Sequence, residues 1–130
     1  MYKYENLEVW QRAMGLYVDL YGQMANCRDF GFKDQITRSA LSIPSNIAEG
    51  EERESNQESA RFLYFAKGSA GELVTQLLLG REVGLLEQES ATRMINEARQ
   101  ISRMLASLIK IRKGSVNEAS ATYAPEEPRT

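Results

Sequence analysis

Residues 7–25, LEVWQRAMGLYVDLYGQMA, decide the fold class. Apolar side chains recur in this stretch at steps of three and four residues, which is the period of an α-helix rather than the alternation of a strand. They form two neighbouring stripes: Leu7, Trp10, Met14, Tyr17, Tyr21 and Met24 in one, and Val9, Ala13, Leu16 and Leu20 in the other. Such a face is wider than one adjacent helix can cover, so the stretch predicts a helix with several packing partners.

A second helix is predicted over residues 33–52, after a turn that we place at Gly31. Its core stripe has helical spacing and consists of Ile36, Ala40, Ile43 and Ile47. Pro44 lies inside this stripe and permits two interpretations. Either a new helix starts with Pro44 at its first position, or one helix continues with a kink where a backbone hydrogen bond is lost. The apolar spacing runs through Pro44 without a phase change, which favours the continuous helix.

Two further helices follow. Ser55 and Glu58 match a capping box that opens the third helix, and Gly84 marks its end. The fourth helix is predicted from about Glu89 to a C-cap at Gly114, with apolar residues Met94, Ala98, Ile101, Leu105 and Leu108 on one face. Four helices joined by short turns predict an all-α, antiparallel up-down-up-down four-helix bundle over residues 1–114. The polar residues 115–130 are predicted to form a disordered tail.

Composition excludes several classes of catalyst. The 130-residue chain has no histidine and one cysteine, Cys27. A tetrahedral zinc site needs four ligands of the Cys or His type, and a ferritin-like di-iron site needs Glu-x-x-His pairs. A histidine general base is also excluded. The residues therefore predict no metal, no cofactor, no catalytic residue and no small-molecule substrate.

Charge and hydropathy limit the location and the partners. The net charge is −2, and 26% of the residues are charged. The chain therefore lacks the strongly basic balance of a dedicated nucleic-acid binder. Its first ten residues contain no continuous apolar segment of the signal-peptide type, and no apolar run is long enough to span a bilayer. We expect a cytoplasmic protein without a membrane partner.

Three blocks of the sequence resemble one protein family. They are LEVWQRA at 7–13, QITRSALSIPSNIAEG at 35–50 and FLYFAKGSAGEL at 62–73. In this order and at these separations they are similar to the 23S rRNA-intervening sequence proteins, and the segment SIPSNIAEG is the most specific match. The resemblance implies a left-handed four-helix bundle that assembles into a ring-shaped homopentamer. A related branch, the accessory variability determinant proteins of diversity-generating retroelements, comprises basic pentamers that bind nucleic acid.

A polar stripe lies opposite the core stripe of the second helix. One interpretation is a solvated face; the other is an intersubunit or pore-lining network in which polar side chains fix the register of an interface. The candidate residues of this network are Gln35, Arg38, Asn46, Glu49 and Arg53. On the first helix, the helical spacing of Trp10, Tyr17 and Tyr21 favours core or subunit-interface packing over a base-stacking platform.

The fourth helix is the basic element of the chain. Residues 90–113 carry a net charge of +5, from six basic side chains and Glu97. Repeated around a ring, these side chains form a band that could hold a polyanion; the other interpretation is a solvated face paired with acidic residues. The candidate nucleic-acid contacts are Arg93, Arg99, Arg103, Lys110, Arg112 and Lys113. We therefore expect a non-enzymatic homopentameric scaffold or interaction protein, with a nucleic-acid-binding accessory protein as the alternative.

Overall fold

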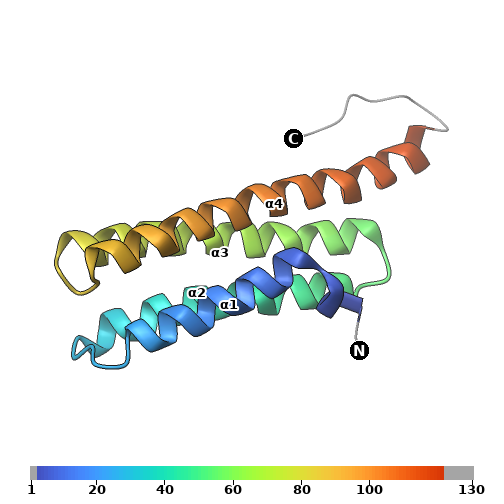
Figure 1. Ribbon diagram of the computed structural model, residues 1–130. Coiled ribbons are helices and arrows are strands. Elements are labelled where there is room, and N and C mark those ends of the chain that lie inside the picture. Colours follow the sequence, from blue (N-terminus) through green and yellow to red (C-terminus); the bar gives the residue numbers. More distant parts are fainter. Residues whose placement is uncertain (1–2, 122–130) are drawn as a thin grey trace.

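The computed structural model describes residues 3–121, and it describes 115–121 by their backbone alone. A short 3-10 helix, η1 (Lys3–Asn6), precedes four α-helices: α1 (Glu8–Gln23), α2 (Phe30–Glu51), α3 (Asn56–Glu82) and α4 (Gln88–Ala121). No strand occurs within the described range. The chain reverses its direction at each connection between α-helices (Figure 1). The predicted all-α four-helix bundle is confirmed, and its left-handed twist stays a prediction.

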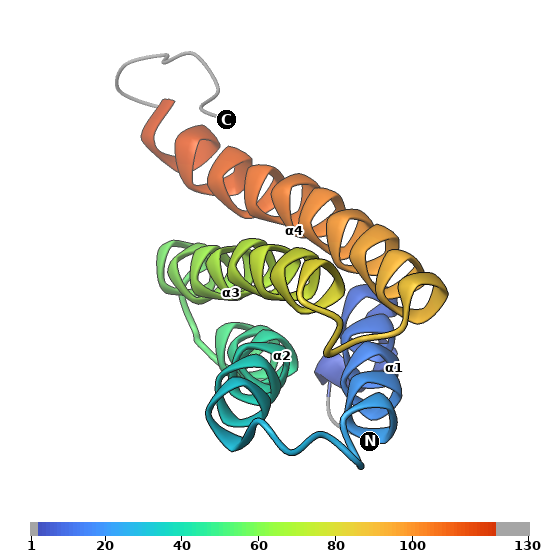
Figure 2. The same ribbon diagram turned by 90° about the vertical axis from the view of Figure 1, so that its left-hand side faces the viewer.

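Each helix packs against two others. Helix α1 contacts α2 and α4, and α3 contacts the same two helices, so that α1 and α3 lie on a diagonal. The view along the bundle shows this arrangement (Figure 2). The contacts of α3 with its neighbours are the more extensive ones. The bundle therefore has a tightly packed side around α3 and a more open side around α1.

One apolar stripe of each helix forms the core. On α2 and α4 the predicted core positions Ile36, Ile43, Ile101 and Leu105 are fully buried. On α1 the core stripe is the second one that we predicted: Val9, Ala13, Leu16 and Leu20. Most residues of the first α1 stripe lie on its flank. They are Leu7, Trp10 and Tyr17, which are half-buried, and Met14 and Tyr21, which are exposed.

Helix α2 runs through Pro44 without interruption, as the spacing favours. Its start differs from the prediction, because α2 begins at Phe30 rather than Lys33. Asp29 is the N-cap, and its carboxylate accepts a hydrogen bond from the Phe32 backbone N–H at 3.0 Å. The predicted turn at Gly31 is therefore wrong: a capped helix takes in this glycine as one of its first residues.

The predicted caps of α3 are confirmed. The Ser55 hydroxyl accepts from the Glu58 N–H at 3.1 Å, as a capping box requires. At the other end Gly84 has φ 79, the left-handed conformation that glycine adopts readily. The N–H of Leu85 donates to the Gly80 carbonyl and that of Gly84 to the Arg81 carbonyl, which is a Schellman motif.

The end of α4 is not where the sequence places it. The helix continues past Gly114 to Ala121, so the predicted C-cap at Gly114 is wrong. The predicted boundary of the bundle at residue 114 stays a prediction. Gly114 lacks the positive φ of a glycine that ends a helix. A glycine inside a helix costs only about 1 kcal/mol and does not by itself stop it. Residues 122–130, the rest of the predicted disordered tail, lie outside the described residues.

A buried ion pair joins α2 to α4 at one end of the bundle. The Arg112 guanidinium donates to the Glu51 carboxylate at 2.6 Å. Glu51 has only 2% of its side chain exposed and Arg112 only 19%. Lys3 of η1 approaches the second oxygen of Glu51 at 3.9 Å. The last turn of α2 is therefore tied both to α4 and to the start of the chain.

The substitution Gly80→Ala tests the close packing of α3. A Cβ at this position would lie 2.6 Å from Phe32 Cζ and 2.8 Å from Leu86 Cδ1, so at least one of these side chains must move. We expect Gly80→Ala to lower the free energy of unfolding by about 1–2 kcal/mol, because overpacking outweighs the better helix propensity of alanine. Urea denaturation followed by circular dichroism measures this change.

Gly114→Ala is the matched control, because its Cβ meets no atom within 4 Å. It is expected to leave the stability unchanged or to raise it by up to about 1 kcal/mol. A Gly80→Ala protein as stable as the parent would contradict the account of tight packing at this position.

Candidate functional site

The predicted polar stripe of α2 does not form one network within the protomer. Gln35, Arg38, Glu49 and Arg53 are exposed, and Asn46 is half-buried. An ion pair within α2 joins Arg38 to Asp34 at 3.0 Å, and Arg53, just after the end of α2, pairs with Glu49 at 3.4 Å. Exposed pairs of this kind contribute little stability. Within the protomer these four residues are therefore solvated, and their role in an intersubunit or pore-lining network stays a prediction.

Asn46 supports a contact between helices indirectly, through Ser42. Its amide donates to the backbone carbonyl and to the hydroxyl of Ser42, both at 2.9 Å. The hydroxyls of Ser42 and Ser69 are hydrogen-bonded at 2.7 Å across the contact of α2 with α3. Ser39 also donates to Glu72 of α3 at 2.9 Å. Sequence reasoning missed the roles of Ser39 and Ser69, although serines beside a core stripe were a usable signal.

The predicted aromatic residues of α1 face the solvent to different degrees. Trp10 and Tyr17 are half-buried and pack against the core. Tyr21 lies beside Tyr17, with ring centroids 6.0 Å apart, and is 60% exposed. Met14 and Val18 are 41% and 65% exposed on the same helix. Helix α1 therefore has a continuous apolar surface that its own chain leaves uncovered; we call Met14, Val18 and Tyr21 the α1 surface.

The basic residues of α4 fall into two groups. Three have partners in this chain: Arg93 pairs with Asp19 at 3.0 Å, Arg112 with Glu51, and Lys113 donates to the Tyr64 hydroxyl at 2.6 Å. The other three have no acidic partner within the described residues and are exposed. They are Arg99, Arg103 and Lys110. The predicted basic band is thus partly neutralised within the protomer.

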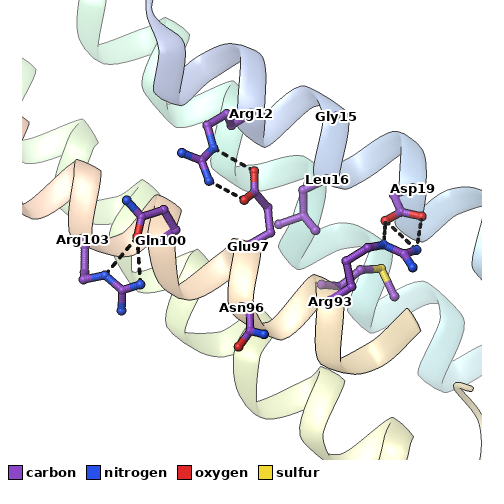
Figure 3. A pocket seen from close by; sticks show the side chains of 10 residues that line it. Arg12, Gly15, Leu16, Asp19, Arg93, Asn96, Glu97, Gln100 and Arg103 are labelled. Carbon is purple, nitrogen blue, oxygen red and sulfur yellow. Dashed lines mark hydrogen bonds and ion pairs between the residues drawn. The ribbon is translucent and has the colours of Figure 1, made fainter. Parts of the chain in front are cut away.

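A polar groove runs between α1 and α4, and sequence reasoning did not find it. Its volume is about 880 Å³. Figure 3 shows its side chains, which come from both helices. We call it the α1/α4 groove; its lining residues are Arg12, Gly15, Leu16 and Asp19 of α1 and Arg93, Met94, Asn96, Glu97, Gln100 and Arg103 of α4.

A two-point ion pair bridges this groove. Arg12 donates from Nε to one Glu97 oxygen at 2.9 Å and from Nη2 to the other at 2.5 Å. These hydrogen bonds lower the pKa of the Glu97 carboxyl below its ordinary value, although partial burial acts in the opposite direction. They also raise the pKa of Arg12. Both groups are therefore fully charged at neutral pH.

The substitution Glu97→Gln tests this pair by its pH dependence. Because folding lowers the pKa of Glu97, its stabilising effect is present at neutral pH and is lost as the pH falls through the folded-state pKa. At pH 7 we expect Glu97→Gln to lower the free energy of unfolding by up to about 1 kcal/mol. The difference should begin to shrink as the pH falls below the ordinary pKa of a glutamate, about 4.3, and the two proteins should converge below the folded-state pKa of Glu97. Urea denaturation at a series of pH values measures the difference.

Glu54→Gln is the control, because Glu54 is an exposed carboxylate in the connection between α2 and α3. The stability difference between this variant and the parent should not change in this way with pH. A constant difference between Glu97→Gln and the parent from pH 7 to pH about 3 would contradict the pKa shift.

The described residues contain no group of three His, Cys, Asp or Glu side chains placed to hold a metal ion. In the same part of the chain, none of the helices combines the length and apolar character that crossing a membrane requires. The side chains that line the α1/α4 groove offer charged and amide groups that can donate and accept hydrogen bonds.

Comparisons with known proteins identify the family. No curated protein matches the chain. Among solved structures, it is similar to a protein of unknown function from the S23 ribosomal protein family of Bacteroides thetaiotaomicron, with a TM-score of 0.74 and 25% identity over 78% of this chain and 98% of that one. The family model described as 23S rRNA-intervening sequence protein matches residues 5–107. That match covers α1, α2 and α3 in full and α4 as far as residue 107, and the chain therefore belongs to the 23S rRNA-intervening sequence protein family.

Proposed function

We propose that this protein is a non-enzymatic scaffold that acts as a ring-shaped homopentamer. The observation that carries the proposal is the α1 surface. Met14, Val18 and Tyr21 follow one another at steps of four and three residues, so they lie on one side of the helix. Contiguous apolar side chains at this exposure are typical of protein–protein interfaces rather than of free surfaces.

The outer side of α3 provides a complementary surface. Gly68, Gly71 and Thr75 recur at steps of three and four residues, and all three are exposed. A Cβ at either glycine would meet no atom within 4 Å, so nothing in the protomer requires glycine at these positions. Each glycine inside a helix costs about 1 kcal/mol. The close approach of a helix from a second copy would explain why small residues occur at these positions. We call Gly68, Gly71 and Thr75 the α3 surface.

The two surfaces favour a closed ring. The α1 surface and the α3 surface belong to helices on opposite corners of the bundle (Figure 2). Contact between unlike surfaces of successive copies is head-to-tail, and such a contact closes into a ring when the rotation per copy fits. The family resemblance gives the number of copies as five.

Light scattering on the full-length protein at micromolar concentration tests the assembly. The expected mass is five times the protomer mass of 14.7 kDa. Val18→Glu places a charge in the α1 surface and Gly68→Leu places a bulky side chain on the α3 surface. Both are expected to yield monomers whose helical circular dichroism is unchanged, because neither residue packs within the protomer.

Val83→Glu is the matched control, because Val83 is 67% exposed but lies at the C-cap of α3, outside both surfaces. It should keep the pentamer mass. A monomeric parent protein, or variants Val18→Glu and Gly68→Leu with the parent mass, would overturn the proposal.

Nucleic-acid binding along α4 is the second candidate function. Arg99, Arg103 and Lys110 are the observation that favours it, because no acidic side chain of the described chain neutralises them. Their spacing of four and seven residues places them on one side of the helix. A ring repeats this set in every copy. The predicted relationship to the nucleic-acid-binding accessory variability determinant proteins supports the same interpretation.

Binding of a short RNA or DNA duplex at about 50 mM salt tests this candidate by fluorescence anisotropy. We expect Arg99→Gln combined with Lys110→Gln to weaken binding and to reduce its salt dependence. Arg38→Gln removes a cation that is paired within α2, so it should change little. No salt-sensitive binding by the parent protein would exclude this function.

A further inference from the structure

The α1/α4 groove has the dimensions of a site for a small molecule. Its volume of about 880 Å³ falls within the range of ligand pockets. Leu16 and Met94, both buried, form an apolar floor. The rim carries guanidinium, carboxylate and amide groups (Figure 3). An apolar floor with a few convergent polar groups is the usual composition of a binding site.

Two ion pairs cross the groove from α1 to α4. Arg93 holds both oxygens of Asp19 by hydrogen bonds of 3.0 to 3.2 Å at one end. Arg12 holds Glu97 one α4 turn further along. Each pair joins α1 to α4, so together they fix the width of the groove. Their charges cancel, which leaves Arg103 as the uncompensated charge among the lining residues.

Arg103 is held in place without being neutralised. It donates from Nε and Nη2 to the Gln100 side-chain oxygen, at 3.2 and 2.8 Å. A neutral amide orients the guanidinium but leaves its full charge and its Nη1 group to bind an anion. Figure 3 shows Gln100 and Arg103 together at one end of the groove, with Arg12 on the opposite helix.

Arg12 has a poorly satisfied donor at the same end. Its Nη1 donates only to the thioether sulfur of Met104, at 3.5 Å. A thioether is a weak acceptor, so an oxygen anion that takes its place forms a stronger, charge-assisted bond. Arg12 contacts Glu97 and Met104, and Arg103 contacts Gln100, which lies between these two residues along α4. Both guanidinium groups therefore flank Gln100.

We propose that the α1/α4 groove binds a small molecule through an oxyanion group, phosphate or carboxylate, held between Arg12, Gln100 and Arg103. Planar guanidinium groups match the oxygens of both anions. The apolar floor at Leu16 and Met94 contacts the body of the molecule, and the exposed Asn96 amide is available for a further hydrogen bond.

The charge pattern favours a small ligand over a nucleic acid. Asp19 and Glu97 line the groove together with the arginines. A phosphate backbone laid along the groove would pass both carboxylates, whereas one anionic group at the Arg103 end avoids them. The site shares Arg103 with the exposed cations that carry the second candidate function, whereas Arg99 and Lys110 lie outside the groove.

Methionine methyl NMR provides a local readout. The chain has five methionines. Met94 lines the groove and Met104 touches Arg12, while Met24 is buried in the core and Met14 belongs to the α1 surface. With the methyl groups labelled with ¹³C, the full-length protein is titrated with inorganic phosphate, a hexose phosphate, a dicarboxylate and an RNA oligonucleotide. We expect saturable shifts of Met94 and Met104 with a small anion, and no shift of Met24.

Two variants and a control assign the site. Arg103→Gln removes the uncompensated charge, and Gln100→Glu neutralises it with almost no change in shape. Each is expected to weaken binding about tenfold or more, the effect of losing a charge-assisted hydrogen bond. Arg99→Gln removes an exposed cation of the same helix outside the groove and should leave the affinity unchanged. The three small-ligand titrations separate phosphate from carboxylate recognition.

Several results would overturn the proposal. They are the absence of methyl shifts at millimolar phosphate, hexose phosphate and dicarboxylate; equal shifts in the parent and in Gln100→Glu; and shifts produced by the RNA alone. Light scattering on the same samples reports the assembly separately, so failure of the ring and failure of the groove are distinguishable.

Discussion

Close approach of α3 to its neighbours is the constraint on which the rest of the structure depends. Two glycines of the bundle are positions where another atom takes the place of a side chain. A Cβ at Gly50 would lie 3.1 Å from the Ser59 backbone oxygen, and one at Gly80 would meet Phe32 and Leu86. Alanines on the buried side of α3, Ala60, Ala66 and Ala70, likewise keep the distance between helices short. Tight packing against α3 therefore fixes the positions of α2 and α4 independently of α1.

Helix α1 is held differently. Its core stripe is apolar, but its contact with α4 ends on the outside in charged pairs across a groove rather than in interlocked side chains. Ion pairs of intermediate exposure add little to stability, yet they define the distance between two helices well. This loosely packed side leaves the α1 surface uncovered and leaves room for a ligand. The proposed assembly and the proposed binding site both follow from the same uneven distribution of packing.

Much of the fold could be predicted because its signals are local. Ile36, Ile43 and Ile47 recur at helical spacing along one helix. Each cap of α3 likewise involves residues within about one turn of each other, as for Ser55 and Glu58. The start of α2 was misplaced because a side-chain cap at Asp29 outweighed a glycine that usually marks a turn. Gly114 was misjudged for a related reason: glycine permits a helix to end but does not require it.

The groove could not be predicted, because its residues meet only through tertiary structure. Arg12 and Glu97 are 85 residues apart in sequence, and Arg93 and Asp19 are 74 apart. No periodic pattern connects positions on the first and last helices. The same holds for Arg112 and Glu51. Composition therefore identifies the basic helix, but it does not show which of its charges are neutralised.

The unequal lengths of the helices make the two ends of the bundle different. Helix α4 has 34 residues and α1 has 16, and the last turns of α4 extend past the neighbouring helices (Figure 1). At a rise of about 1.5 Å per residue, the helix carries the backbone about 10 Å onward from Gly114 to Ala121. A fluorophore or an affinity handle attached to the last turns of α4 is thus displayed beyond one end of the bundle, so a surface tether at those turns would hold the molecules in a uniform orientation.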